Sequence, residues 1–191
     1  MSRHPKPPQR NTDASEQPKV KLPPAALESF AIEKDYGDAP ALHPLNLRIE
    51  HGQRVALLGH NGSGKTTFIR MAAGLLDPTA GSVTVNSHDP HSIEARAFTS
   101  YLADTPVFYD DLSVWEHLEY VARMHGVADW EQHGADLLDH LGIYERAEDL
   151  PQRFSRGLRQ KAAIAIAFIR PFELLLVDEP FVGLDEPGRL A

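Results

Sequence analysis

The sequence contains no cysteine among its 191 residues. Disulfide bonds, thiolate nucleophiles and cysteine-ligated zinc or iron–sulfur sites are therefore excluded, and nothing in the composition indicates an oxidising compartment. The chain also has no apolar run long enough to span a bilayer, and its N-terminus lacks the apolar core of a signal peptide. We therefore expect a cytoplasmic protein, which leaves docking on a membrane protein open.

A surplus of positive charge is absent as well, since the formal net charge is −8 at pH 7. This balance argues against a general nucleic-acid binder. Residues 1–24 differ: five basic and two acidic side chains give this segment a charge of +3, and it holds six prolines. Such a segment buries too little apolar surface to offset its ordering entropy, so we expect a disordered tail over 1–24 and one domain over 25–191. A solvated leader is a simpler interpretation than a lipid-binding arm, because the charges form no dense cluster.

Hydrophobic periodicity predicts alternating strands and helices along the rest of the chain. Alternating or short apolar runs predict strands over residues 27–32, 45–49, 54–58, 82–85, 98–103 and 174–177. Apolar residues at helical spacing predict helices over residues 67–76, 115–125, 130–141 and 158–169. Because strands flank a block of helices, we expect an α/β fold with a mainly parallel sheet and a helical insertion.

One segment, Gly59–Thr66, fits the phosphate-loop motif G-x-x-x-x-G-K-[ST] at every fixed position. Its glycines allow the backbone to fold around a phosphate with N–H groups pointing inward, and the next helix presents its positive end to the same anion. We expect Lys65 to reach the outer phosphates and the Thr66 hydroxyl to bind Mg²⁺. The predicted nucleotide ligands in this loop are Gly59, Asn61, Gly62, Ser63, Gly64, Lys65, Thr66 and Thr67.

Two acids, Asp178 and Glu179, follow the apolar run at 174–177 directly. The carboxyl ends of strands are where open parallel sheets bind ligands. We expect Asp178 to bind Mg²⁺, directly or through water, and Glu179 to orient or deprotonate the attacking water as the catalytic base. A strand that ends in solvated acids is the simpler explanation for such a pair alone, but the phosphate loop makes it less plausible.

Three further segments narrow the family. The run Phe154–Lys161 resembles the ABC signature LSGGQ-x-Q-[KR], and Val182–Asp185 resembles the D-loop of that family. Tyr36 stands where the family has an aromatic residue that stacks on adenine. The stretch from about residue 27 to 191 therefore resembles an ABC nucleotide-binding domain. The resemblance implies a P-loop NTPase core with a mainly parallel sheet, an N-terminal antiparallel β portion and a helical subdomain at about 107–160.

The resemblance also implies cofactors and partners. It implies ATP and Mg²⁺, a separate transmembrane permease, and a second ATP-binding domain that closes head to tail on the first. In that arrangement the Ser155 hydroxyl and the backbone at Gly157 contact the γ-phosphate held by the other domain. The run Leu112–Leu118 and the segment Ser155–Gly157 most resemble ATPases of drug-type exporters. We therefore expect an ATP-hydrolysing subunit at the inner face of the cell membrane that powers an exporter, with no nucleic-acid partner.

Two other functions remain as alternatives: a soluble ABC ATPase that acts on ribosomes or DNA, and an ATP-binding module with little hydrolysis. The chain departs from the family pattern in ways that bear on the second. Asp104 stands where the family has a glutamine that contacts Mg²⁺; aspartate is still a hard oxygen ligand, so we predict Asp104 as a metal ligand. Arg156 replaces a signature glycine. The chain stops six residues after Asp185 and has no histidine beyond it, so we expect a poor, marginally stable ATPase when the chain is alone.

Overall fold

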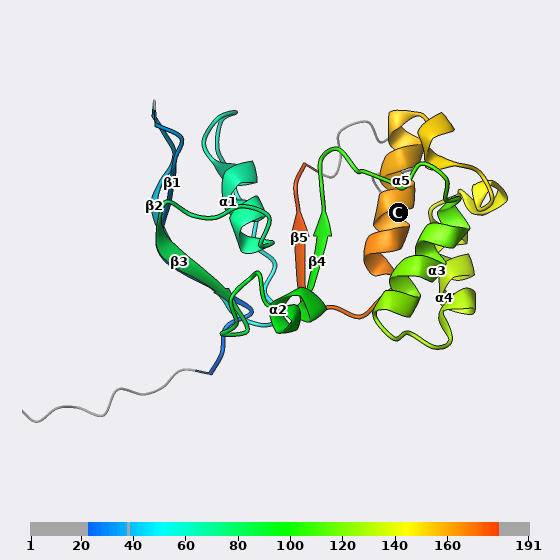
Figure 1. Ribbon diagram of the computed structural model, residues 1–191, viewed down its shortest axis with the longest axis horizontal. Helices are drawn as coiled ribbons and strands as arrows, with labels where there is room; N and C mark the ends of the chain where they lie inside the picture. Colours follow the sequence, from blue (N-terminus) through cyan, green and yellow to red (C-terminus); the bar gives the residue numbers. More distant parts are fainter. Residues whose placement is uncertain (1–22, 38, 180–191) are drawn as a thin grey trace, which may run out of the picture.

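The computed structural model describes residues 23–37 and 39–179, and its elements follow one another as Figure 1 shows. The strands are β1 (Leu27–Asp35), β2 (Pro40–Ile49), β3 (Ala80–Val85), β4 (Thr99–Leu102) and β5 (Leu174–Val177). The helices are α1 (Lys65–Ala72), α2 (Ile93–Phe98), α3 (Val114–Met124), α4 (Trp130–His140) and α5 (Arg156–Phe168), with short 3₁₀ turns η1 (Tyr144–Arg146) and η2 (Pro151–Arg153). Most of the predicted tail, over 1–22, and the D-loop-like segment over 182–185 lie outside the described residues.

The N-terminal half forms an antiparallel sheet in the order β2-β1-β3. In the centre of this sheet, Leu27 of β1 pairs with Ile49 on one side and with Val85 on the other, and its side chain is fully buried. Leu27 and Ile32 of β1 are buried in one core with Phe68 and Met71 of α1, whereas Phe30 of β1 is exposed. The expected antiparallel β portion is confirmed.

A second, parallel pair is formed by β4 and β5, in register from Thr99 opposite Leu174 to Leu102 opposite Val177. Helix α1 lies between this pair and the antiparallel sheet, while α5 covers the pair from the other side (Figure 1). The first hydrophobic core fills the layer around α1, with Phe68, Met71 and Ala72 buried there. The carboxyl end of β5 and the start of α1 lie close together, because Thr66 in α1 is hydrogen-bonded to Asp178, the residue after β5.

The helical block formed by α3, α4 and α5 has a hydrophobic core of its own. Leu118, Leu138 and Ala165, one from each helix, are fully buried in it. The two tryptophans, Trp115 and Trp130, pack together with ring centroids 4.9 Å apart, which confirms their expected place in the core. Among the described residues, no helix is long and apolar enough to cross a membrane.

The predicted strand over 54–58 is wrong, because the structure gives residues 53–60 no strand pairing. A cavity of about 560 Å³ separates this segment from β5, and apolar side chains of both line it. A strand exists only when a neighbouring backbone is within hydrogen-bonding distance, and among the described residues β5 pairs with β4 alone. Leu58, at the end of the segment, is 92% exposed.

Other predicted boundaries shift by local causes. The helix expected over 67–76 starts two residues earlier and ends at Ala72, because Gly74 adopts a left-handed φ of 67° just beyond it. The strand expected over 98–103 is shortened to Thr99–Leu102, because Phe98 completes the short helix α2, which the periodicity did not indicate.

Candidate functional site

The phosphate loop turns tightly between residue 58 and the first turn of α1. Gly64 has a φ of 88°, and a Cβ atom at this position would lie 2.5 Å from the backbone oxygen of Ala41 in β2. Gly62 also has a left-handed φ, of 83°. Both conformations are easy for glycine and costly for other residues. The motif glycines thus allow the loop to pack against β2, and the backbone N–H of Ser63 donates to His60 O at 3.1 Å inside the loop.

The loop borders a cavity of about 250 Å³ that collects most of the predicted phosphate ligands. Its lining consists of Ala41, Asn61, Gly62, Gly64, Lys65, Thr66, Thr67 and Glu179. Helix α1 begins at this cavity, and its N-cap, Gly64, offers no side-chain cap to the first N–H groups. Those free donors and the positive end of the helix therefore favour an anion here.

The Lys65 ammonium group lies folded over its own loop. Its Nζ donates to Gly59 O at 2.9 Å and to His60 O at 3.0 Å. These carbonyls hold the cation beside the cavity without neutralising it, because neither carries a full charge. Lys65 therefore remains free to exchange these bonds for a charge-assisted bond to a phosphate oxygen.

Two of the three predicted metal ligands are joined by a hydrogen bond that spans 112 positions of the chain. The Thr66 hydroxyl donates to Asp178 Oδ1 at 2.9 Å. Asp178 is only 2% exposed and is held at the end of β5 by the bond from its N–H to Leu102 O, at 2.9 Å. None of the ion pairs between described residues includes Asp178.

This donor set fits a magnesium ion. A hydroxyl and a carboxylate are the hard oxygen ligands that Mg²⁺ accepts, and it binds few protein groups when a phosphate supplies others. A buried carboxylate without a cationic partner is also costly by itself, so a divalent cation beside Asp178 would compensate its charge.

Glu179 is exposed and lines the same cavity as the phosphate loop. Its φ of 51° lies in the left-handed region, which few residues other than glycine adopt. The chain therefore turns sharply after Asp178, which allows two consecutive acids to reach different positions: Asp178 the buried contact with Thr66, and Glu179 the cavity.

The signature-like residues occupy the start of α5, away from this cavity. Ser155 is the N-cap of α5 and accepts a hydrogen bond from Leu158 N at 3.4 Å, and Gly157 is the second residue of the helix. Neither lines the cavity beside Lys65. Asp104, which the sequence analysis predicts as a metal ligand, is bonded to Arg156 Nη2 at 3.0 Å and not to Thr66 or Asp178.

Tyr36 lies in the turn between β1 and β2, and its ring is 65% exposed. The Lys34 ammonium nitrogen stands 5.2 Å from the centre of the ring. Tyr36 does not line the cavity beside the phosphate loop. An exposed ring at that place is free to stack on a base, so adenine stacking stays a prediction.

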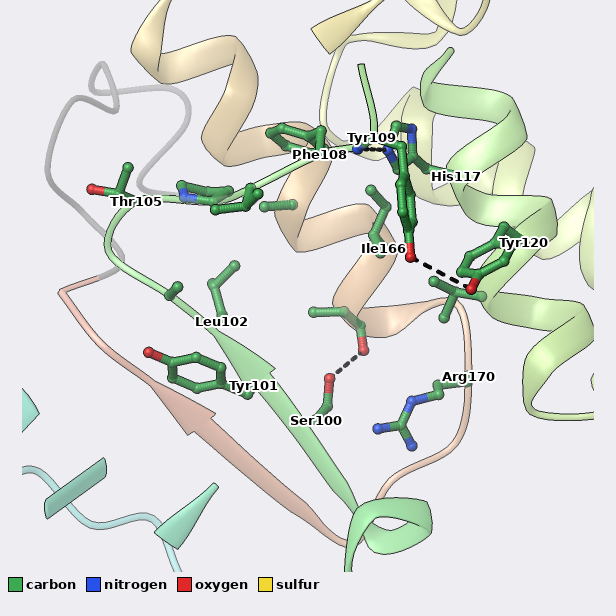
Figure 2. Close-up of a pocket in the computed structure, with 16 residues that line it drawn as sticks. Ser100, Tyr101, Leu102, Thr105, Phe108, Tyr109, His117, Tyr120, Ile166 and Arg170 are labelled. Carbon is green, nitrogen blue, oxygen red and sulfur yellow. Dashed lines mark hydrogen bonds between the residues drawn. The ribbon is translucent and has the colours of Figure 1, made fainter. Parts of the chain in front are cut away.

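Sequence reasoning missed a second hollow, a groove of about 630 Å³ between β4, the segment 103–109 and helices α3 and α5 (Figure 2). We call this hollow the β4–α5 groove. Most of its lining side chains are apolar or aromatic: Tyr101, Leu102, Ala103, Pro106, Val107, Phe108, Tyr109, Tyr120, Val121, Ala163, Ile166 and Ala167. The density of aromatic residues between 101 and 120 is the signal that could have indicated it.

His117 holds one wall of the β4–α5 groove in place. Its Nε2 accepts the Tyr109 N–H at 2.9 Å (Figure 2). The ring proton therefore sits on Nδ1 and is donated to Ser113 O at 2.7 Å. At the floor, Arg170 donates to main-chain oxygens, including that of Ala97 at 3.0 Å, and burial lowers its pKa. Val107 and Tyr109 in the wall are 93% and 54% exposed.

Comparison with known proteins gives one consistent result. The family model described as ABC transporter matches residues 42–182. Over 156 residues the chain is 38% identical to the ABC-type transporter ATP-binding protein EcsA of Bacillus subtilis, an alignment that covers 78% of this chain and 62% of EcsA. It is 33% identical to the SkfA peptide export ATP-binding protein SkfE of Bacillus subtilis, covering 83% of this chain and 67% of SkfE.

The comparisons extend to an importer and to a solved structure. The aliphatic sulfonates import ATP-binding protein SsuB of Albidiferax ferrireducens is 34% identical, with 83% of this chain and 55% of SsuB covered. A solved ATP-binding subunit of an ABC transporter superposes with a TM-score of 0.80 at 31% identity, covering 87% of this chain and 71% of that one. The chain thus spans about half to two thirds of the length of these curated relatives.

Proposed function

Because the chain belongs to the ABC transporter family, we propose that it binds Mg-ATP and hydrolyses it to power a membrane exporter through a separate transmembrane partner. The observation that carries this proposal is the 2.9 Å contact between Thr66 and Asp178 beside the cavity of the phosphate loop. It joins the two halves of a metal–phosphate site that lie 112 residues apart in the sequence.

Each group of the site has a role in nucleotide binding. The loop N–H groups and the start of α1 bind the phosphates, and Lys65 turns from its carbonyl partners to the outer phosphate oxygens. Thr66 and Asp178 would hold Mg²⁺, which supplies charge neutralisation to the phosphates when bound. Tyr36 is proposed to stack on the base. That Asp104 serves as a further metal ligand stays a prediction from the sequence.

Hydrolysis requires a base and a cap over the outer phosphate. Glu179 lines the cavity and is proposed to orient and deprotonate the attacking water. The cap is proposed to come from a second ATP-binding domain, through its residues equivalent to Ser155 and Gly157. In support, α5 and α1 lie on opposite sides of the β4–β5 pair (Figure 1), so the signature of one chain cannot cover its own phosphate loop without a large movement.

The β4–α5 groove is proposed to receive the transmembrane partner at the inner face of the membrane. Its exposed aromatic wall suits an apolar helix face, and its lining includes Ala103 and Thr105, the two neighbours of Asp104 in the chain. The direction of transport is proposed from the exporter-like segments of the sequence and from the export named for SkfE. Import, named for SsuB, is the alternative, as are a soluble ATPase on ribosomes or DNA and a weakly hydrolysing module.

Comparison of the wild type with Glu179→Gln tests the assigned chemistry. We expect the variant to bind Mg-ATP normally and to lose turnover by about 10²- to 10⁴-fold, because the water loses its positioned base. Asp136→Asn, an acid on the exposed side of α4, serves as the control and should leave both quantities unchanged. Equal turnover in wild type and Glu179→Gln would show that Glu179 is not the base.

A further inference from the structure

Two of the residues at which this chain departs from the ABC pattern contact each other. Asp104 stands where the resemblance implies glutamine, and Arg156 stands where it implies glycine. Arg156 Nη2 donates to Asp104 Oδ1 at 3.0 Å, across 52 positions of the chain. Each departure thus supplies the charge that balances the other.

The position of Arg156 in its helix explains why it needs this partner. Arg156 is the first residue of α5, directly after the N-cap Ser155, and the first turn of the helix contains no acidic residue. The N-terminal end of a helix carries partial positive charge, so a cation there is unfavourable by itself. Asp104 supplies the missing negative charge from another element of the fold.

Asp104 connects the signature to both other parts of the proposed machinery. It follows β4 by two residues, and Leu102 at the end of β4 accepts the N–H of Asp178 at 2.9 Å. On its other side the chain continues from Thr105 to Tyr109 along the wall of the β4–α5 groove. The ion pair therefore ties the start of α5 to the segment between the metal-binding strand end and the groove.

Global stability is not what this ion pair provides. The Arg156 and Asp104 side chains are 54% and 41% exposed, and exposed ion pairs contribute little to the free energy of unfolding. Its effect is local, because it restrains one helix end against one loop.

We propose that Asp104 and Arg156 are positioning residues that form a latch. Their ion pair fixes the N-terminal end of α5, with Ser155 and Gly157, relative to the segment 103–109. The latch assigns the Asp104 carboxylate to Arg156 and not to Mg²⁺. One consequence rests on the proposed function. A transmembrane partner that moves the wall of the β4–α5 groove would also move Ser155 and Gly157, because the ion pair links the two segments.

Hydrogen exchange of the nucleotide-free chain tests the latch independently of ATP chemistry. The amide of Leu158 is the probe, because its N–H is hydrogen-bonded to the Ser155 hydroxyl oxygen. Asp104→Asn and Arg156→Met should each speed hydrogen exchange of this amide by about two- to fivefold, as expected for the loss of an exposed ion pair. Arg159→Met is the matched control, because Arg159 lies in the same turn of α5 and forms no ion pair with any described residue. Removing this cation should leave the exchange rate of the Leu158 amide unchanged.

The charge-exchanged variant, Asp104→Arg combined with Arg156→Asp, separates the ion pair from the two side chains. It should restore slow exchange, because it rebuilds the pair and places an acid at the helix N-terminus. Fast exchange in this variant, or an equal increase in Arg159→Met, would overturn the latch. So would an Asp104→Asn variant with normal exchange and a raised Mg²⁺ requirement for ATP binding, because the carboxylate would then serve the metal. Failure of the wild type to bind ATP would instead contradict the proposed function alone.

Discussion

The helical block and the nucleotide-binding half bury their apolar residues to different degrees. The helical block closes over its core, where Leu118 and Leu138 are fully buried. The nucleotide-binding half keeps an apolar cavity of about 560 Å³ between the segment 53–58 and β5. Neighbours along the chain complete the helical packing, whereas parallel strands depend on partners far away in the sequence.

The largest expected effect compares one leucine from each region. Leu118→Ala should lower the free energy of unfolding by about 2–5 kcal/mol, because it opens a cavity in a closed core. Leu176→Ala should cost less than Leu118→Ala, since Leu176 already lines the cavity beside β5. Urea unfolding monitored by tryptophan fluorescence measures both. An equal or larger loss for Leu176→Ala would show that the two regions are packed alike.

Ligand binding should act on the two regions unequally. At a concentration of Mg-ATP about 100 times its Kd, binding stabilises the native state by about 2.7 kcal/mol. We expect this to appear as slower hydrogen exchange in the phosphate loop, α1 and the end of β5, with little change in α3 and α4. Equal protection of both regions would mean that they open as one unit and would remove the distinction drawn between them.

Local features of both regions could be predicted from the sequence, whereas contacts between distant segments could not. The phosphate loop and the helices α3 to α5 were predictable, because glycine spacing and 3.6-residue periodicity are local signals. The segment 54–58 carries an apolar pattern typical of a strand, but its pairing depends on a backbone that local pattern does not specify. The Asp104–Arg156 contact and the β4–α5 groove also join residues that are far apart in the sequence. Their residues could be identified from the sequence, but their contact in space could not be predicted from local patterns.

Helix caps offer a smaller comparison. Ser113 begins α3 with a capping box, in which its Oγ accepts the Glu116 N–H at 3.2 Å and its own N–H donates to Glu116 Oε2 at 2.7 Å. Ser92 caps the six-residue helix α2 by a single bond, to Ala95 N at 3.1 Å. Ser113→Ala should cost about 1 kcal/mol and Ser92→Ala less, measured by thermal unfolding. The reverse order would show that the second bond of the capping box adds no stability.

The smallest expected effect is a pH dependence of that capping box. Hydrogen bonds from Ser113 hold the pKa of Glu116 below its ordinary value of 4.5. The stabilisation by the carboxylate is therefore fully present above pH 4.5 and is lost as the pH falls through the lower, folded-state pKa. Glu116→Gln, which does not titrate, should remove this part of the acid dependence of unfolding. Identical pH profiles for wild type and variant would mean that the capping box carries no charge-dependent stability.

Nucleotide titration of wild type and Lys65→Ala, with and without Mg²⁺, tests the central claim most directly. We predict Mg²⁺-dependent ATP binding that weakens by about ten- to hundredfold in Lys65→Ala, because a charge-assisted bond to phosphate is lost. Arg123→Ala, on the exposed side of α3 and outside the cavity beside the phosphate loop, should bind ATP as the wild type does. Equal affinities of wild type and Lys65→Ala would contradict the assignment of this loop as the nucleotide site.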